Sequence, residues 1–271
     1  MGIYSFSPFG YEGSLVSVEV DLRRGIPAID IVGLADGTVK ESRERMRSAI
    51  LNSGFDFPPE RVLISLSPAD LKKEGAGFDL ALALAVLQAK EECCGEKILV
   101  MGELELNGKI RPVKGIHAAV STALSKGINF CIVPKANERE ALEVRGMNVF
   151  GALSLKDAFE ALEKKDLFVC LKESPSDMLL SGIPQDAVCL DGVYFLAENA
   201  EEDFSLVKNQ GFLIRALQIA AAGGHNLLAY GPPGCGKTLS LQKFPQLLPL
   251  LSFEDAASLT RIYSIAGLLP A

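Results

Sequence analysis

The sequence predicts an α+β domain followed by the first part of an α/β domain. Three observations support this prediction. Patterns typical of strands and helices fill residues 1–165, a stretch with little periodicity follows over 166–204, and a glycine-rich loop follows an apolar strand within 205–271. We therefore expect a folded domain over 1–165, a linker over 166–204 and the start of a second domain over 205–271.

The first domain begins with strands and a helix. Residues 14–22 alternate apolar and polar side chains, which is typical of a half-buried strand, and 28–32 predict a second strand that pairs with the first as a hairpin. A helix is expected to begin at Thr38, because Thr38 and Glu41 have the spacing of a capping box. Gly54 is expected to end that helix as its left-handed cap.

The middle of the first domain predicts a buried helix and a second hairpin. A strand over 61–66 precedes a run rich in Ala and Leu over 78–89, which indicates a buried helix. Residues 98–106 and 109–113 predict two strands joined at Asn107-Gly108. We expect a type I′ turn there, because Asn-Gly suits that turn.

The last part of the first domain alternates helices and strands. Asn137 with Glu140, and Ser154 with Asp157, have the spacing expected at helix starts. The elements predicted here are helices at about 115–126, 136–142 and 154–164, and strands over 130–133 and 148–150.

Composition limits the class of protein. Hydrophobic residues make up 48% and charged residues 23%, and the formal net charge is −7, so nothing favours a nucleic-acid coat over the whole chain, although a local basic groove stays open. The six cysteines form no C-x-x-C pair, so a zinc site is not expected. The N-terminus lacks a secretory pattern and no apolar run has the roughly 18 residues of a membrane helix, so we expect a cytoplasmic protein without a membrane partner.

The motif that carries chemistry is a complete match to the P-loop pattern G-x-x-x-x-G-K-[ST]. The glycines allow the backbone to fold around phosphate with its N–H groups pointing inward, Lys237 is expected to reach the β- and γ-phosphates of ATP, and the Thr238 hydroxyl is expected to bind Mg²⁺. An apolar strand over 226–230 and a helix over 239–244 give the loop its required context. The predicted nucleotide-binding residues are Gly231, Pro232, Pro233, Gly234, Cys235, Gly236, Lys237, Thr238 and Leu239.

Hydrolysis of ATP needs more than a P-loop. It requires an acidic residue on a neighbouring strand and a residue that positions water. Only 33 residues follow Thr238 (271 − 238), and the acidic segment 252–255 is typical of a helix start. We therefore assign no catalytic residue and expect that this chain does not hydrolyse ATP by itself.

Other charged residues have more ordinary interpretations. The basic side chains of the helix over 38–53 are interleaved with glutamates, which favours a solvated helix face over a phosphate contact. Residues 72–74 are interpreted as a surface loop, His225 as a turn residue and His117 as a packing residue. The basic residues of that helix are Lys40, Arg43, Arg45 and Arg47.

Many short segments, in one order along the chain, make the sequence similar to the YifB/ComM family of magnesium-chelatase-like AAA+ ATPases. These segments are 31–36, 41–45, 52–55, 68–75, 78–80, 220–228, the P-loop and 264–268. Members of that family are much longer, so the resemblance implies that this chain is an N-terminal fragment that ends inside the AAA+ module.

The resemblance also implies a fold and an activity. The family's first domain is similar to the Lon protease domain and the second domain of ribosomal protein S5. The Lon pattern puts Gly77 at the position of the nucleophilic serine and Ala119 at about that of the lysine, which implies a domain without proteolytic activity. For the full-length protein the resemblance implies a hexameric, ATP- and Mg²⁺-dependent DNA helicase that promotes branch migration.

Two other functions stay open at this point. The full-length protein could be an ATP-dependent remodeller of protein partners, with the Lon-like domain as a recognition platform. It could also be a subunit of a magnesium chelatase, which is the least favoured because those ATPase subunits generally lack a Lon-like domain. No base-reading motif is visible in the sequence, so only the resemblance supports DNA as the partner.

Overall fold

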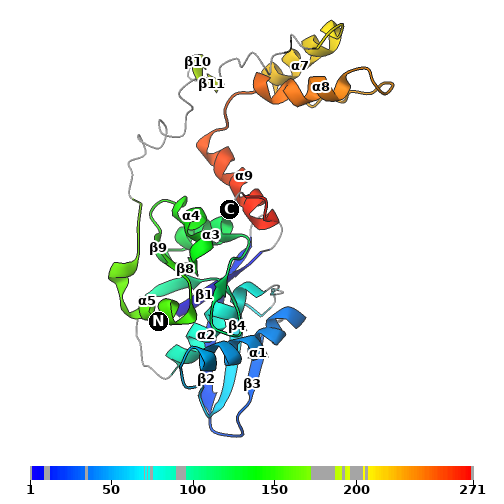
Figure 1. The fold of residues 1–271 in the computed structure, drawn as a ribbon. Coiled ribbons are helices and arrows are strands. Elements are labelled where there is room, and N and C mark those ends of the chain that lie inside the picture. The colour runs from blue at the N-terminus through cyan, green and yellow to red at the C-terminus, as the bar shows by residue number, and fades with distance from the viewer. Residues whose placement is uncertain are drawn as a thin grey trace. The chain divides into compact units, whose positions relative to one another are not determined.

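The computed structural model describes residues 2–8, 13–33, 36–69, 71, 73, 76–89, 96–171, 187–190, 193–195, 204 and 207–269. Two compact units form (Figure 1). The first comprises Met1–Lys172 together with Ala257–Ala271, and the second comprises Glu173–Ala256. Most of the predicted linker over 166–204 lies outside the described residues. Its boundaries, and those of the two predicted domains, stay a prediction.

A seven-stranded sheet forms the centre of the first unit, in the order β3-β4-β2-β1-β5-β8-β9. The pairs β1–β2 and β2–β4 are antiparallel, and the other four pairs are parallel. The sheet is therefore mixed and mostly parallel, within a mixed α/β architecture. The strands are β1 (Gly2–Ser7), β2 (Ser14–Arg23), β3 (Ile29–Val32), β4 (Arg61–Ser67), β5 (Lys97–Val100), β8 (Phe130–Pro134) and β9 (Asn148–Ala152).

Helices cover the sheet unequally. On one face they bury a core that extends under all seven strands, with α1, α2 and α5 contributing apolar side chains. On the other face α3 and α4 cover β1, β5, β8 and β9, together with Leu15 at the start of β2. The helices are α1 (Gly37–Asn52), α2 (Asp79–Gln88), α3 (Ile116–Ser125), α4 (Glu138–Leu142) and α5 (Leu155–Glu163), with short 3₁₀ turns η1 (Ala76–Phe78), η2 (Lys135–Asn137) and η3 (Lys165–Leu167).

This arrangement explains the two kinds of strand pattern. In β2, Val16 and Val18 are buried while Glu19 on the opposite face is exposed, as the predicted alternation requires. In β5 and β8 both faces are covered, so Ile98, Leu99 and Val100 are all buried in succession. Parallel strands between helices need such continuous apolar runs.

The hairpin predicted from residues 14–32 is wrong. Strand β4 lies between β2 and β3, pairing antiparallel with β2 and parallel with β3. Helix α1 provides the crossover from β3 to β4, and parallel strands need a connection of that length. The prediction failed because the short connection between β2 and β3 suits a hairpin. The strand that pairs with both of them, β4, lies further along the chain.

The second predicted hairpin exists but is shorter. Only β6 (Glu103–Leu104) and β7 (Ile110–Arg111) pair with each other, since β5 belongs to the central sheet. Its turn is not type I′. Gly108 has φ of 84°, whereas positive φ among the described non-glycine residues occurs only at Asn209, so Asn107 has a negative φ. The Gly108 N–H donates to the Glu105 carbonyl, as in a type I turn followed by a glycine bulge.

The second unit contains fewer elements. Strands β10 (Val188–Leu190) and β11 (Val193–Phe195) pair as a hairpin, and α7 (Gly211–Gly223), α8 (Lys237–Lys243) and η5 (Phe244–Leu247) follow. The strand predicted over 226–230 does not form, and Leu228 and Tyr230 are 87% and 91% exposed. A strand of a parallel sheet needs neighbouring strands, and no partner strand lies beside this segment among the described residues. Helix α9 (Phe253–Ala266) follows, and its residues from Ala257 onward belong to the first unit.

Candidate functional site

The P-loop has a backbone that only glycine readily adopts. Gly234 and Gly236 have φ of 79° and 80°, in the left-handed region that side chains disfavour. Gly236 directly precedes α8, as the sequence predicts. A chain with these turns can direct successive N–H groups toward one anion.

Lys237 is the first residue of α8, and its side chain folds back over the loop. Its Nζ lies 2.8 Å from the Gly231 carbonyl oxygen and 2.7 Å from that of Pro232. The Cys235 Sγ is 3.3 Å from the same nitrogen. The ammonium group is therefore held at the loop by neutral acceptors, which a phosphate would outcompete because a charged acceptor binds an ammonium group more strongly.

A residue that the sequence interpretation missed supports the loop from outside. Gln210, just before α7, donates from Nε2 to the Cys235 carbonyl oxygen at 2.9 Å. It lies 25 positions before Cys235, so no local pattern could reveal the contact. Thr238 and Leu239 are exposed, so both remain accessible to a ligand.

The loop fits a nucleotide phosphate chain by this geometry. Its glycines leave room beside the backbone: a Cβ built at Gly234 meets no atom within 4 Å, and one at Gly236 comes no closer than 3.9 Å, to Gln210. Lys237 supplies a cation at the loop and Thr238 supplies an accessible hydroxyl. These are the groups that a P-loop uses for phosphate and Mg²⁺.

The acidic segment near the end of the chain is a helix start, as predicted. The Ser252 hydroxyl accepts a hydrogen bond from the Asp255 N–H at 3.2 Å and donates to the Asp255 carboxylate at 2.6 Å. This is the N-terminal cap of α9. Glu254 and Asp255 therefore belong to the first turn of a helix and not to the end of a strand.

The two positions compared with the Lon dyad lie in helical elements of the first unit. Gly77 is in η1, where its carbonyl accepts from the Gly102 N–H at 3.0 Å. A Cβ there would have only ordinary contacts, the nearest 3.9 Å away at Met101, so glycine is not required for space. Ala119 is fully buried in α3. Neither side chain can act as nucleophile or base.

The basic residues on α1 differ from one another. Arg45 forms a two-point ion pair with Asp79 of α2, at 2.8 and 3.1 Å, and Asp79 is completely buried. The hydrogen bond to Asp79 raises the pKa of Arg45. Arg43 pairs with its neighbour Glu44 at the surface, and Arg47 lies over the ring of Phe57. The solvated-face interpretation is therefore wrong for Arg45, which the sequence could not distinguish because its partner lies 34 positions away. The side chain of Lys40 lies outside the described residues.

The surface-loop interpretation of residues 72–74 is wrong for Lys73. This side chain is fully buried, and its ammonium group donates to the Pro68 carbonyl oxygen. Lys72 and Glu74 lie outside the described residues. Burial of a lysine requires hydrogen-bond partners, and the loop provides them from its own backbone.

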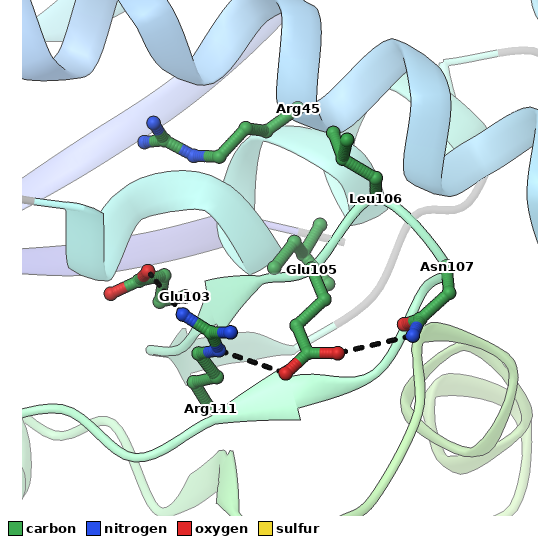
Figure 2. A pocket seen from close by; sticks show the side chains of 7 residues that line it. Arg45, Glu103, Glu105, Leu106, Asn107 and Arg111 are labelled. Carbon is green, nitrogen blue, oxygen red and sulfur yellow. Dashed lines mark hydrogen bonds and ion pairs between the residues drawn. The ribbon is translucent and has the colours of Figure 1, made fainter.

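A shallow pocket of about 390 Å³ lies beside the β6–β7 hairpin (Figure 2). Figure 2 shows Arg111 between Glu103 and Glu105, with Asn107 directed at the far oxygen of Glu105. The hydrogen bond from Arg111, and then that from Asn107, lower the pKa of Glu105. Glu103, Glu105 and Arg111 thus bind one another, and Arg45, which also lines the pocket, is paired with Asp79.

Both histidines have the structural roles expected from the sequence. The His225 N–H donates to the Ala220 carbonyl as part of the turn that ends α7, and its ring lies against Gly223. His117 is buried in α3. Burial lowers the pKa of His117, the nearby Glu140 raises it and Arg261 lowers it.

Comparison with known proteins finds related sequences along nearly the whole chain. Two family models match, described as "Subunit ChlI of Mg-chelatase" over residues 18–137 and "Magnesium chelatase, subunit ChlI" over 203–271. YifB of Escherichia coli is 37% identical over 98% of this chain and 49% of its own length, and the competence protein ComM of Haemophilus influenzae is 34% identical over 97% and 49%. The chain belongs to the YifB/ComM family.

This YifB/ComM family member spans about half the length of the curated relatives that it matches. About half of the chain is also similar to Lon proteases. The Lon protease of Methanosarcina barkeri is 30% identical over 52% of this chain and 18% of its own length, and that of Mesomycoplasma hyopneumoniae is 25% identical over 51% and 17%. Of the helices that the structure describes, none is both long enough and apolar enough to cross a membrane.

Proposed function

We propose that the chain is the nucleotide-binding N-terminal part of an ATP-driven AAA+ motor. The single observation that carries this proposal is the loop over 231–238, in which left-handed glycines precede Lys237 and the lysine ammonium group is held at the loop. A phosphate that replaces the Gly231 and Pro232 carbonyls as the partner of Lys237 would gain a charge-assisted hydrogen bond.

Each residue of the loop has a proposed role. The backbone N–H groups of Gly234, Cys235 and Gly236 would bind the phosphate chain, since Pro232 and Pro233 have no N–H. Lys237 would bind the β- and γ-phosphates, and the Thr238 hydroxyl would bind Mg²⁺. The bound Mg²⁺ would neutralise part of the phosphate charge. Gln210 holds the Cys235 carbonyl and so positions the loop from outside. Leu239 lies at the start of α8 beside the loop and would contact the nucleotide through its apolar side chain.

The finer proposal is a DNA motor. The complete protein would be a hexameric helicase that promotes branch migration, with ATP, Mg²⁺ and DNA as its partners. Support comes from the 34% identity to ComM, which is named a competence protein. We further propose that the first unit has the Lon-like fold and lacks proteolytic activity, since Gly77 and Ala119 occupy the positions compared with the Lon dyad.

The decisive experiment uses the complete protein. Its ATP hydrolysis is measured with and without single-stranded DNA, beside a Lys237→Ala variant and a Lys243→Ala control. Lys243 lies at the other end of α8. We expect hydrolysis that DNA stimulates and that Lys237→Ala abolishes, whereas Lys243→Ala leaves it within about twofold.

Two results would overturn parts of the proposal. Hydrolysis that is robust but indifferent to DNA would exclude the DNA motor and favour the remodelling of protein partners. Nucleotide binding that survives Lys237→Ala would exclude the loop as the phosphate site.

A further inference from the structure

The last residues of the chain match the same family model as the P-loop, but in the structure they pack with the N-terminal unit. The magnesium-chelatase family model extends through residues 203–271 and so includes the P-loop and all of α9. In the structure, Ala257–Ala271 packs within the first unit, whose sequence matches a different family model over 18–137. A segment that continues the nucleotide-binding region therefore contributes to the fold of the N-terminal region.

Ser264 is the centre of this packing. Only 2% of it is exposed. Its hydroxyl donates to Glu140 Oε1 of α4 at 2.6 Å, and its carbonyl oxygen accepts the Gly115 N–H at 3.0 Å. Glu140 Oε1 also accepts the His117 N–H at 3.0 Å. One carboxylate oxygen therefore binds both the start of α3 and the end of α9.

Two further contacts extend the interface along α9. One turn before Ser264, the Arg261 Nη2 donates to the Ser121 hydroxyl of α3 at 2.6 Å. The Ile265 side chain packs on the core that α3 and α4 share, and a Cβ built at Gly115 would lie 3.8 Å from its Cγ1. Polar and apolar contacts therefore both hold residues 261–265 of α9 against α3 and α4.

The end of α9 has a fixed backbone. Gly267 has φ of 70°, its N–H donates to the Ser264 carbonyl, and the Leu268 N–H donates to the Tyr263 carbonyl. These two bonds define a Schellman cap. The alkyl chain of Lys114 lies so close that a Cβ at Gly267 would approach its Cε to 2.5 Å. The positive φ favours glycine at this position, and a larger residue would also displace the flexible end of the Lys114 side chain.

We propose that residues 261–268 are an anchor that holds the nucleotide-binding region to the N-terminal fold, with the α3–α4 face as its receptor and Glu140 as the central acceptor. Arg261, Ser264 and Ile265 act as positioning residues of this anchor. The anchor does not depend on bound nucleotide, so it can be tested separately from the proposed ATPase function.

Hydrogen exchange and histidine NMR on the whole chain test the anchor. The sequence contains two histidines, so His117 and His225 give two resolved ring signals, and His225 of the second unit serves as the reference. The test variant combines Arg261→Gln with Ser264→Ala, and the control is Arg215→Gln, an exposed arginine of α7. We expect the Gly115 amide to exchange at least about tenfold faster in the test variant, which corresponds to about 1.4 kcal/mol.

The His117 ring gives an independent readout. Loss of Arg261 and exposure of the α3–α4 face both remove causes that lower the pKa of His117, so this pKa should rise in the test variant and stay constant in the control. Amides of β8 must remain protected, which shows that the fold is intact. If the double substitution removes the protection of the β8 amides, the single variant Ser264→Ala replaces it as the test and should still accelerate the exchange of the Gly115 amide. Unchanged Gly115 exchange and an unchanged His117 titration would overturn the proposal.

Discussion

At the scale of single residues, buried polar side chains differ in whether they have a partner. Ser5 and Ser7 lie on β1 and are both fully buried. Within the part of the chain that the structure describes, the Ser5 hydroxyl has no hydrogen-bond partner, whereas Ser7 takes part in a polar interaction. A buried hydroxyl without a partner has lost its hydration and received nothing in return.

Replacement of the two serines should therefore change stability in opposite directions. Ser5→Ala should raise the free energy of unfolding by about 1 kcal/mol, and Ser7→Ala should lower it by about 1 kcal/mol. Urea denaturation of the whole chain, followed at the transition of the first unit, measures both changes. Equal effects of the two substitutions would contradict the assignment of their partners.

The lowered pKa of His117 should make the stability of the first unit depend on pH. Because burial lowers the pKa of His117 in the folded state, the unfolded chain binds more protons at this site once the pH falls below its ordinary value of about 6.5. The associated stability is complete above that pH and decreases as the pH falls toward the folded pKa.

Comparison with a neutral residue isolates this contribution. Between pH 7.5 and 5.5, the wild-type chain should lose more unfolding free energy than His117→Gln does. Glu143, whose pKa burial raises, contributes with the opposite sign in both proteins and so cancels. Denaturation midpoints at four or five pH values measure the difference, and parallel curves would exclude His117 as the cause.

At the scale of elements, one ion pair joins three parts of the first unit. Arg45 of α1 binds Asp79 of α2, and Asp79 Oδ2 also accepts the Leu104 N–H of β6 at 3.2 Å. Arg45→Met should lower the free energy of unfolding by about 3 kcal/mol, because it leaves a fully buried carboxylate without its cation.

The same helix provides a matched control. Arg43 forms an ion pair with Glu44 in which both side chains are about half exposed or more. Arg43→Met should therefore cost less than about 0.5 kcal/mol. Thermal or urea unfolding distinguishes the two variants, and a similar loss in both would show that the burial of Asp79 has little energetic effect.

Local signals predicted most of these elements. The Ser154–Asp157 capping box forms with both of its hydrogen bonds, Gly54 adopts the left-handed conformation, and the Ala- and Leu-rich helix α2 is buried. Each of these features depends on residues within four positions. Strand pairing does not, and so the sequence interpretation placed β3 beside β2 although β4 separates them. Strand β1 was missed, since its short run carries little period-two signal.

In the candidate site, too, features set by consecutive residues could be predicted, and features set by distant partners could not. The P-loop could be predicted because its eight residues are consecutive. The contact of Gln210 with the loop and the ion pair of Arg45 could not, since their partners are 25 and 34 positions away. Lys73 is fully buried, which no local pattern of charge reveals.

At the scale of the molecule, the two units differ in how much core they contain. Among the described residues of the second unit, only Val207, Leu217, Ala220 and Ser240 are buried, whereas the first unit has cores on both faces of its sheet. Calorimetry of the whole chain should therefore show two transitions, with the second unit unfolding at the lower temperature.

A bound nucleotide should move only the lower transition. At a hundred times its dissociation constant, Mg²⁺ with a non-hydrolysable ATP analogue should stabilise the second unit by about 2.7 kcal/mol. In the presence of the same Mg²⁺ and ATP analogue, the Lys237→Ala chain should unfold in both transitions at the temperatures seen without ligand. A ligand-dependent shift of the upper transition would instead indicate a nucleotide site in the first unit.

The position of β1 has a consequence for synthesis on the ribosome. Strand β1 emerges before both of its neighbours in the sheet, β2 on one side and β5 on the other. Its first partner follows within a few residues, but its second begins at Lys97, so the nascent chain exposes one unpaired edge of β1 while the 90 residues from Ser7 to Lys97 (97 − 7) are translated. Slow translation before β5 should prolong this exposure and favour aggregation of nascent chains.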